Sequence, residues 1–128
     1  MDVSKTLMGT LGIEIVEVNE GRVVATMPVD ERTHQPMGLL HGGASVALAE
    51  TVASLGGFTM VDEKTEAVVG LEINANHLKS KRDGFVTATG NIVHRGKKTM
   101  VWEIKITDEE NELICISRCT LAVIQTKK

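Results

Sequence analysis

Apolar and polar positions alternate near the start of the chain, as they do in β-strands with one buried face. Residues 12–29 (GIEIVEVNEGRVVATMPV) keep this alternation on both sides of residues 19–21, Asn-Glu-Gly, which is typical of a β-hairpin. Residues 3–11 can form a short helix before it, and residues 30–40 (DERTHQPMGLL) are expected to be a loop. The apolar side of the short helix consists of Leu7, Met8 and Leu11.

The pattern changes after residue 40. From Gly42 onward, Ala, Val and Leu surround the axis of a helix instead of forming one stripe, which predicts a helix covered on nearly every face. Gly56 and Gly57 can supply the left-handed residue of a helix terminus, so the helix is expected to end there.

Four strand-like runs follow, at residues 67–79, 84–94, 99–108 and 112–125, joined by the polar turns SKRDG, RGKK and DEEN. One buried helix followed by an antiparallel meander predicts an α+β fold, with a curved sheet of about six strands wrapped around the helix. No linker or repeat interrupts the 128 residues, so residues 1–128 are expected to form one domain.

Composition narrows the classes of function. The net charge is -3 and aromatic residues are scarce, which argues against a nucleic-acid site and an acidic-membrane patch. The N-terminus lacks the features of a signal peptide, so a cytoplasmic location is expected. Cys115 and Cys119 stand four positions apart on one predicted strand, about 13 Å, too far for a disulfide. Free thiols suit a reducing compartment.

Glu50 is the only formally charged residue between Leu39 and Val61. A buried, unpaired carboxylate is costly, so Glu50 is exposed at an oligomer edge, paired, or used in chemistry. Ser54 lies one turn further along the same side of the helix, and the two form a polar island on an apolar helix.

The helix start, LLHGGAS, offers a second feature. The first amides of a helix lack intrahelical acceptors, and glycine lets a ligand oxygen approach them; the alternative is a simple tight turn. Glu50 lies eight residues after Gly42, about 12 Å along one helix, so one chain cannot place both on one small ester. A two-fold dimer with antiparallel helices can, and a site shared between subunits is therefore predicted.

The runs TMPVDERTHQPMGLLHGGASVALAETVASLGG and VVGLEINANHLKS resemble the hotdog-fold acyl-CoA thioesterases over nearly the whole chain. The similarity is greatest to the group containing the phenylacetate-degradation thioesterase, the Arthrobacter-type 4-hydroxybenzoyl-CoA thioesterase and 1,4-dihydroxy-2-naphthoyl-CoA hydrolase. This resemblance implies that Glu50 is the general base or nucleophile and that the Gly42 amide contacts the thioester oxygen. It also implies that Gln35 and His41 orient the thioester. The implied acyl-side residues are Ser54, Gly70 and His77.

Coenzyme A carries phosphates, and basic turns suit them. In the family, positions bordering the coenzyme match Leu78, Lys79, Ser80, His94, Arg95, Gly96, Lys97, Lys98 and Thr99. The alternative for residues 94–99 is a solvated hairpin tip. His77 alternates with Ile73 and Ala75 and is expected on their inward face, either as a structural histidine or as a substrate contact. His41 can likewise be a helix cap. The four histidines show no ligand spacing for a metal, so neither a metal nor a separate cofactor is expected.

The preferred function is hydrolysis of an acyl-CoA thioester to a carboxylic acid and free CoA. An aromatic acyl group, including the naphthoyl intermediate of menaquinone synthesis, is favoured by the resemblance, which also implies a tetramer made from two dimers. Two alternatives remain: a hotdog hydratase or dehydratase using His41 and Glu50 as an acid/base pair, and an acyl-CoA binding module without turnover.

Overall fold

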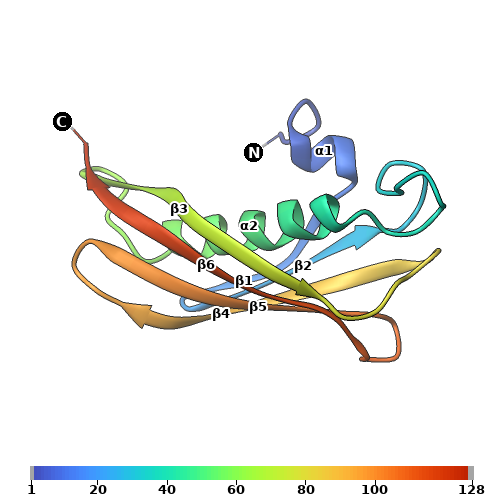
Figure 1. Cartoon of the computed structure of the whole chain (residues 1–128). Helices are drawn as coiled ribbons and strands as arrows, with labels where there is room; N and C mark the ends of the chain where they lie inside the picture. Colours follow the sequence, from blue (N-terminus) through green and yellow to red (C-terminus); the bar gives the residue numbers. More distant parts are fainter. Residues whose placement is uncertain (1, 127–128) are drawn as a thin grey trace.

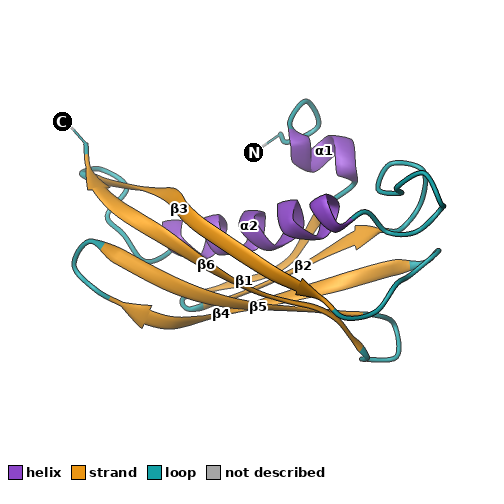
Figure 2. Cartoon of the chain, viewed as in Figure 1, coloured by secondary structure: helices purple, strands orange, loops and turns teal. Residues whose placement is uncertain are grey.

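The structure, a computed structural model, describes residues 2–126. It contains two helices and six strands (Figures 1 and 2). In chain order they are α1 (Leu7–Leu11), β1 (Glu14–Asn19), β2 (Arg22–Pro28), α2 (Gly42–Phe58), β3 (Glu66–His77), β4 (Phe85–Arg95), β5 (Thr99–Thr107) and β6 (Leu113–Gln125). The strands form one antiparallel sheet that curves around α2, which confirms the expected α+β architecture. No helix in this part of the chain is long and apolar enough to cross a membrane.

The strand order corrects the predicted meander at one point. The spatial order is β1-β2-β4-β5-β6-β3, so only β4, β5 and β6 form a meander. β3 pairs along its whole length with β6, from Glu66 opposite Gln125 to His77 opposite Cys115. The alternation that marks a strand carries no information about its neighbours. Here α2 carries the chain across the concave face to the far edge of the sheet before β3 begins.

Helix α2 ends one residue after the predicted glycine pair, but the two glycines do not have the predicted left-handed role. The helix continues through Gly56 and Gly57 to Phe58, and neither glycine adopts a positive φ. Their role is space: a Cβ on Gly56 would lie 2.3 Å from Cη2 of Trp102, and one on Gly57 would lie 2.6 Å from Cδ1 of Leu121. The two glycines therefore let the helix approach the sheet closely where the buried tryptophan occupies the core.

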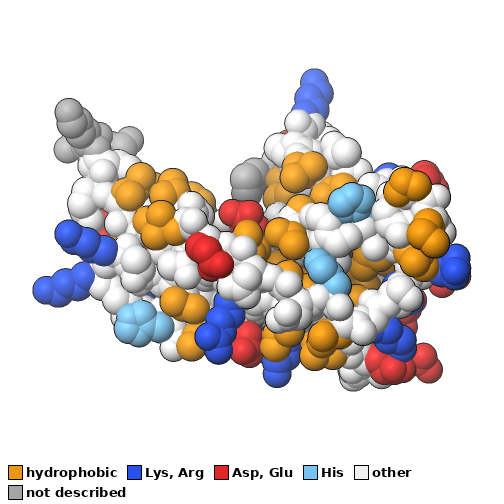
Figure 3. All heavy atoms as spheres, in the orientation of Figure 1, with side chains coloured by type: hydrophobic (Ala, Val, Ile, Leu, Met, Phe, Trp, Pro, Cys, Tyr) orange, Lys and Arg blue, Asp and Glu red, His pale blue; other side chains and the backbone are white. Residues whose placement is uncertain are grey.

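Only one side of α2 is covered within a single chain. Its sheet-facing residues, including Leu48, Val52 and Ala53, are fully buried, whereas Phe58 on the other side is 49% exposed. Helix α1, shorter than the predicted 3–11, lies above this open side (Figure 1). Hydrophobic side chains remain at the surface over α1 and β3 (Figure 3), among them Leu7 and Leu71. The prediction of a helix covered on nearly every face is thus not met by one chain.

Candidate active site

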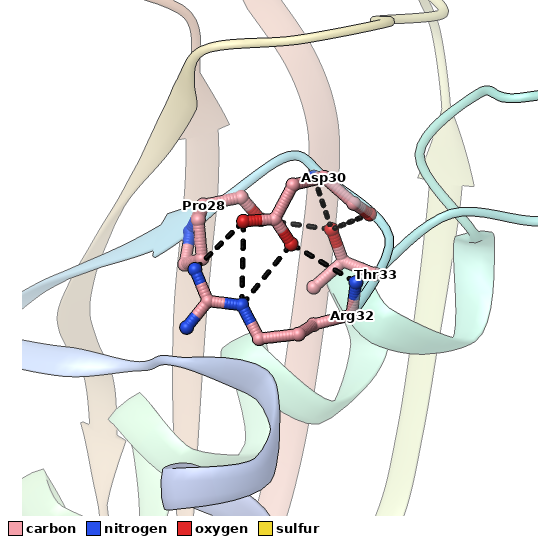
Figure 4. A network of polar contacts seen from close by, with 4 residues as sticks. All are labelled: Pro28, Asp30, Arg32 and Thr33. Carbon is pink, nitrogen blue, oxygen red and sulfur yellow. Dashed lines mark hydrogen bonds and ion pairs between the residues drawn. The ribbon is translucent and has the colours of Figure 1, made fainter.

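The loop between β2 and α2 is held by a compact polar network (Figure 4). The buried hydroxyl of Thr33 donates to the carbonyl oxygen of Pro28 (2.8 Å) and accepts from the N–H of Asp30 (3.2 Å). Arg32 binds the Asp30 carboxylate at 2.7 Å. The carbonyl of Thr33 then accepts the N–H of His41 (2.8 Å), so this network fixes the point at which α2 starts.

Gln35 lies in the same loop, and only the oxygen end of its side-chain amide is bound within that loop. Its Oε1 accepts N–H groups from Met37 and Leu39, within a turn in which Gly38 has a φ of +79°. These two bonds assign the orientation of the amide. The Nε2 group makes no hydrogen bond to a described residue and stays available as a donor.

His41 is the N-cap of α2. Its Nδ1 accepts the N–H of Gly43 at 2.8 Å, so a neutral ring carries its proton on Nε2. The N–H of Gly42 makes no hydrogen bond within residues 2–126 and stays available to an outside acceptor. The predicted cap role of His41 is therefore present, and it leaves the Gly42 amide free.

A pocket of about 410 Å³ opens beside this helix start. Gln35, Gly42 and His77 line it, together with Ser45 and the residues from Leu78 to Ser80. His77 points inward as predicted, since its Nε2 would lie 3.0 Å from a Cβ on Gly42. Donors gather in this pocket, but no carboxylate lines it.

Glu50 lines a different hollow, of about 760 Å³, on the open side of α2. Its other walls include Ser54 and Phe58 from the same helix and Leu7 and Met8 from α1. Most of this lining is apolar, which suits the hydrocarbon part of an acyl group. Within one chain the predicted carboxylate and the predicted amide donor therefore open into separate pockets, and His41 lines a third with Leu11 and Arg32.

The carboxylate of Glu50 is half-buried against β3 and β6. A Cβ on Gly70 would lie 2.5 Å from Oε2 of Glu50, so the missing side chain of that residue makes room for the carboxylate. Burial, together with the nearby carboxylates of Glu50 and Glu72, raises the pKa of the Cys119 thiol to about 11. Cys119 therefore stays a protonated thiol near neutral pH and is not a competing nucleophile. Both cysteines are free, as expected from their spacing, and both are buried.

The contact between Gly70 and Glu50 predicts a specific loss. Gly70→Ala should push the carboxylate out of its place and lower kcat by about 10²-fold, because a displacement of about 1 Å can have an effect of that size. The measurement is steady-state hydrolysis of an acyl-CoA, with circular dichroism and light scattering to confirm an unchanged fold and assembly. A correctly folded variant with the parental kcat would show that Glu50 does not depend on this space.

The two groups of predicted coenzyme-binding residues lie at opposite ends of α2. Leu78, Lys79 and Ser80 border the pocket at its start. The turn at residues 95–99 lies beyond its other end, where Arg95 reaches the carbonyl of Met60 at 3.5 Å. A helix of 17 residues spans about 26 Å, so a single chain does not bring the two groups together.

Lys79 forms ion pairs with two acidic side chains. Its ammonium lies 2.7 Å from Glu112 and 3.6 Å from Asp108, and the hydrogen bond to Glu112 raises the pKa of Lys79. A coenzyme phosphate would have to compete with these carboxylates. The histidines join no metal-ligand cluster among the described residues; the one group of three with suitable spacing is Asp108, Glu110 and Glu112.

A curved antiparallel sheet around one central helix is the arrangement of the hotdog-fold thioesterases. The family model described as Thioesterase superfamily matches residues 37–115, and the chain belongs to this family of thioester-hydrolysing enzymes. ComA2 of Bacillus subtilis is 62% identical over 98% of this chain and 99% of its own length. The 1,4-dihydroxy-2-naphthoyl-CoA hydrolase of Listeria monocytogenes is 57% identical over 95% of this chain and 98% of its own. The crystal structure of the thioesterase HI1161 from Haemophilus influenzae has a TM-score of 0.93 and 51% identity, covering 98% of this chain and 87% of that one.

Two parts of the site are absent from the sequence-based expectations. Ser45 lines the pocket at the helix start, and α1 supplies a wall of the Glu50 pocket through Leu7 and Met8. The spacing of Ser45, three residues after Gly42, places both on one helical face and could have indicated it. The position of α1 over α2 depends on tertiary packing, for which local sequence gives no signal.

Proposed function

We propose that this thioesterase hydrolyses an aromatic acyl-CoA in an active site formed by two chains. The observation that carries the proposal is that one protomer places its hydrogen-bond donors and its carboxylate in separate pockets. Hydrogen-bond donors surround Gly42, the carboxylate of Glu50 lies in a separate apolar pocket, and no carboxylate lines the donor pocket. The donor pocket therefore lacks a carboxylate, and the Glu50 pocket lacks the Gly42 N–H. A two-fold dimer with antiparallel α2 helices would place Glu50 of one protomer opposite Gly42 of its partner.

In this arrangement the free N–H of Gly42 binds the thioester carbonyl oxygen and stabilises the oxyanion that forms from it. The Nε2 group of Gln35, in the same pocket, is available to orient the thioester. His41 lines the neighbouring pocket, so its contribution here is the cap that leaves the Gly42 N–H free. Glu50 takes a proton from water as the water oxygen attacks the carbonyl carbon, and it returns the proton to the sulfur when the carbon–sulfur bond breaks.

Direct attack by Glu50 is the other route, through an anhydride that water then hydrolyses. A single turnover in oxygen-18 water separates the two routes. Label in the Glu50 carboxylate would support the anhydride, whereas label in the product acid alone would support attack by water.

The substrate class rests on the pocket and on the relatives. The apolar walls from Leu7, Met8 and Phe58 suit a flat hydrocarbon acyl group, and Ser54 beside Glu50 can hydrogen-bond a ring substituent. The Listeria relative is named for 1,4-dihydroxy-2-naphthoyl-CoA. We propose a hydroxyaryl-CoA as substrate, with the naphthoyl intermediate of menaquinone synthesis as the first compound to test.

The same dimer would bring together the two groups of basic residues that lie at opposite ends of α2. Antiparallel helices bring the end of one α2 beside the start of the other, so the turn at residues 95–99 of one protomer would approach Lys79 of its partner. Both could then border one coenzyme. Exposed hydrophobic residues on the open side of α2 and along β3 are the surfaces that such an assembly would cover, and a pair of dimers is the proposed final state.

A thiol-release assay over a panel of acyl-CoAs tests the activity. Release of free CoA from hydroxynaphthoyl- and hydroxybenzoyl-CoA should be at least about tenfold faster than from palmitoyl-CoA, because one extra or missing apolar group in a pocket changes discrimination by this order. Equal rates on all substrates would contradict an aromatic preference. Hydration of an enoyl-CoA without thiol release would favour a hydratase, and binding without turnover would favour a binding module.

A further inference from the structure

We infer that the hydroxyl of Ser45 is a second hydrogen-bond donor to the thioester carbonyl oxygen, beside the N–H of Gly42; this inference rests on the proposed function. Ser45 lies in the first turn of α2, and only 1% of the residue is exposed. What little of it remains accessible opens into the pocket that Gln35, Gly42 and His77 line.

The hydroxyl of Ser45 has no hydrogen-bond partner among the described residues. The two threonine hydroxyls on or next to the same helix do find partners: Oγ1 of Thr51 donates to the carbonyl of Ala47 (2.7 Å), and that of Thr59 donates to the carbonyl of Gly56 (2.6 Å). Ser45 makes no such bond to the preceding turn. Because buried polar groups are almost always satisfied, its partner is expected to be a ligand in the pocket.

Helix geometry directs the hydroxyl to the right place. Residues three apart share one face of a helix, and each Cα–Cβ bond tilts toward the N-terminus, so the side chain of Ser45 starts on the Gly42 side of its turn. His77 closes the opposite side, with its Nε2 3.0 Å from a Cβ placed on Gly42. An oxygen bound to the Gly42 N–H would therefore lie between the serine hydroxyl and the imidazole.

A capping role does not account for this serine. His41 already caps the helix through Nδ1, and Ser45 lies four residues beyond that cap. Packing alone does not require a hydroxyl either, since an alanine would fill nearly the same volume. Ser117 on β6 is the useful contrast, because its buried hydroxyl also lacks a partner but lines no part of this pocket.

The test compares Ser45→Ala with Ser117→Ala, which makes the same chemical change outside the pocket. Ser45→Ala should lower kcat by about 10²-fold, the lower end of the range for an oxyanion donor, with a small change in KM. Ser117→Ala should keep the parental kcat. Neither variant should unfold at a lower temperature, because neither hydroxyl has a partner in the chain.

Two non-hydrolysable ligands locate the contact. In a ketone analogue of the acyl-CoA a methylene replaces the sulfur and the carbonyl stays, whereas in a thioether analogue a methylene replaces the carbonyl. Ser45→Ala should weaken binding of the ketone about tenfold, which corresponds to about 1.4 kcal/mol. Binding of the thioether should stay unchanged, because it has no carbonyl oxygen to accept the hydrogen bond. Equal effects on both analogues, or none on either, would overturn the inference.

The parental enzyme and Glu50→Gln complete the experiment. If the parental enzyme releases CoA in a Glu50-dependent manner while Ser45→Ala keeps full kcat, the role of Ser45 is wrong and the proposed function stands. If the parental enzyme releases no CoA from any acyl-CoA, the proposed function fails, and the role of Ser45 fails with it.

Discussion

Glu50→Gln is expected to lower kcat for acyl-CoA hydrolysis by about 10²- to 10⁴-fold, the usual range for loss of a general acid/base. The substitution keeps the size and polarity of the side chain in the space beside Gly70 but removes the carboxylate that is proposed to accept the proton. KM should change little, because the residues proposed to contact CoA lie away from Glu50. The measurement is thiol release at saturating substrate.

Glu72→Gln is the matched control for this variant. Glu72 is a second carboxylate of the same neighbourhood, since both it and Glu50 raise the pKa of Cys119, but Glu72 is exposed and lines neither the Gly42 nor the Glu50 pocket. It should keep the parental kcat. A loss in Glu72→Gln as large as that in Glu50→Gln would indicate a general electrostatic effect in place of a specific proton acceptor.

The second large effect concerns stability. Gly56→Ala is expected to lower the free energy of unfolding by about 1–3 kcal/mol, the cost of adding a methyl group to a packed core. The added Cβ would lie 2.3 Å from Cη2 of Trp102, which is fully buried and cannot move without displacing its neighbours. Denaturation in urea, followed by tryptophan fluorescence and circular dichroism, measures the change.

Combining Gly56→Ala with Trp102→Phe tests whether the contact with Trp102 causes the loss of stability. Trp102→Phe removes the ring atoms that a Cβ on Gly56 would meet, so the pair should lose clearly less stability than the sum of the single changes. Circular dichroism is the readout for variants without the tryptophan. Additive losses would show that Gly56 is required for some reason other than its contact with Trp102.

Much of the fold is predictable from the sequence, because the signals are local. Alternation around residues 19–21 predicts the hairpin, and the four later strands begin and end within two residues of their expected limits. The strand order was not predictable in this way, since pairing of β3 with β6 depends on where α2 leaves the chain. Gly56 and Gly57 misled the prediction of the helix end because glycine serves both left-handed termini and close packing.

The candidate site is likewise predictable only in part. Gly42 and Glu50 stand out by residue type and spacing, and the structure places them in separate pockets, as a shared site requires. The family resemblance adds Gln35 and His77, which lie beside Gly42. Ser45 is not predictable from residue type, because a serine in a helix is common, and its near-complete burial beside the pocket depends on tertiary packing.

The claim that two chains build each active site is tested most directly by subunit complementation. Gly42→Val, whose side chain would press on the His77 ring, blocks the donor half, and Glu50→Gln blocks the carboxylate half. Each variant alone should be inactive. In a mixed dimer, one of the two sites receives an intact Gly42 from one chain and an intact Glu50 from the other.

Coexpression of the two variants in equal amounts should therefore restore about a quarter of the parental specific activity, since half of randomly formed dimers are mixed and each has one intact site. Purification through two different tags isolates the mixed dimer, which should have about half the parental activity. Mixed dimers with no more activity than either variant alone would contradict a site shared between chains.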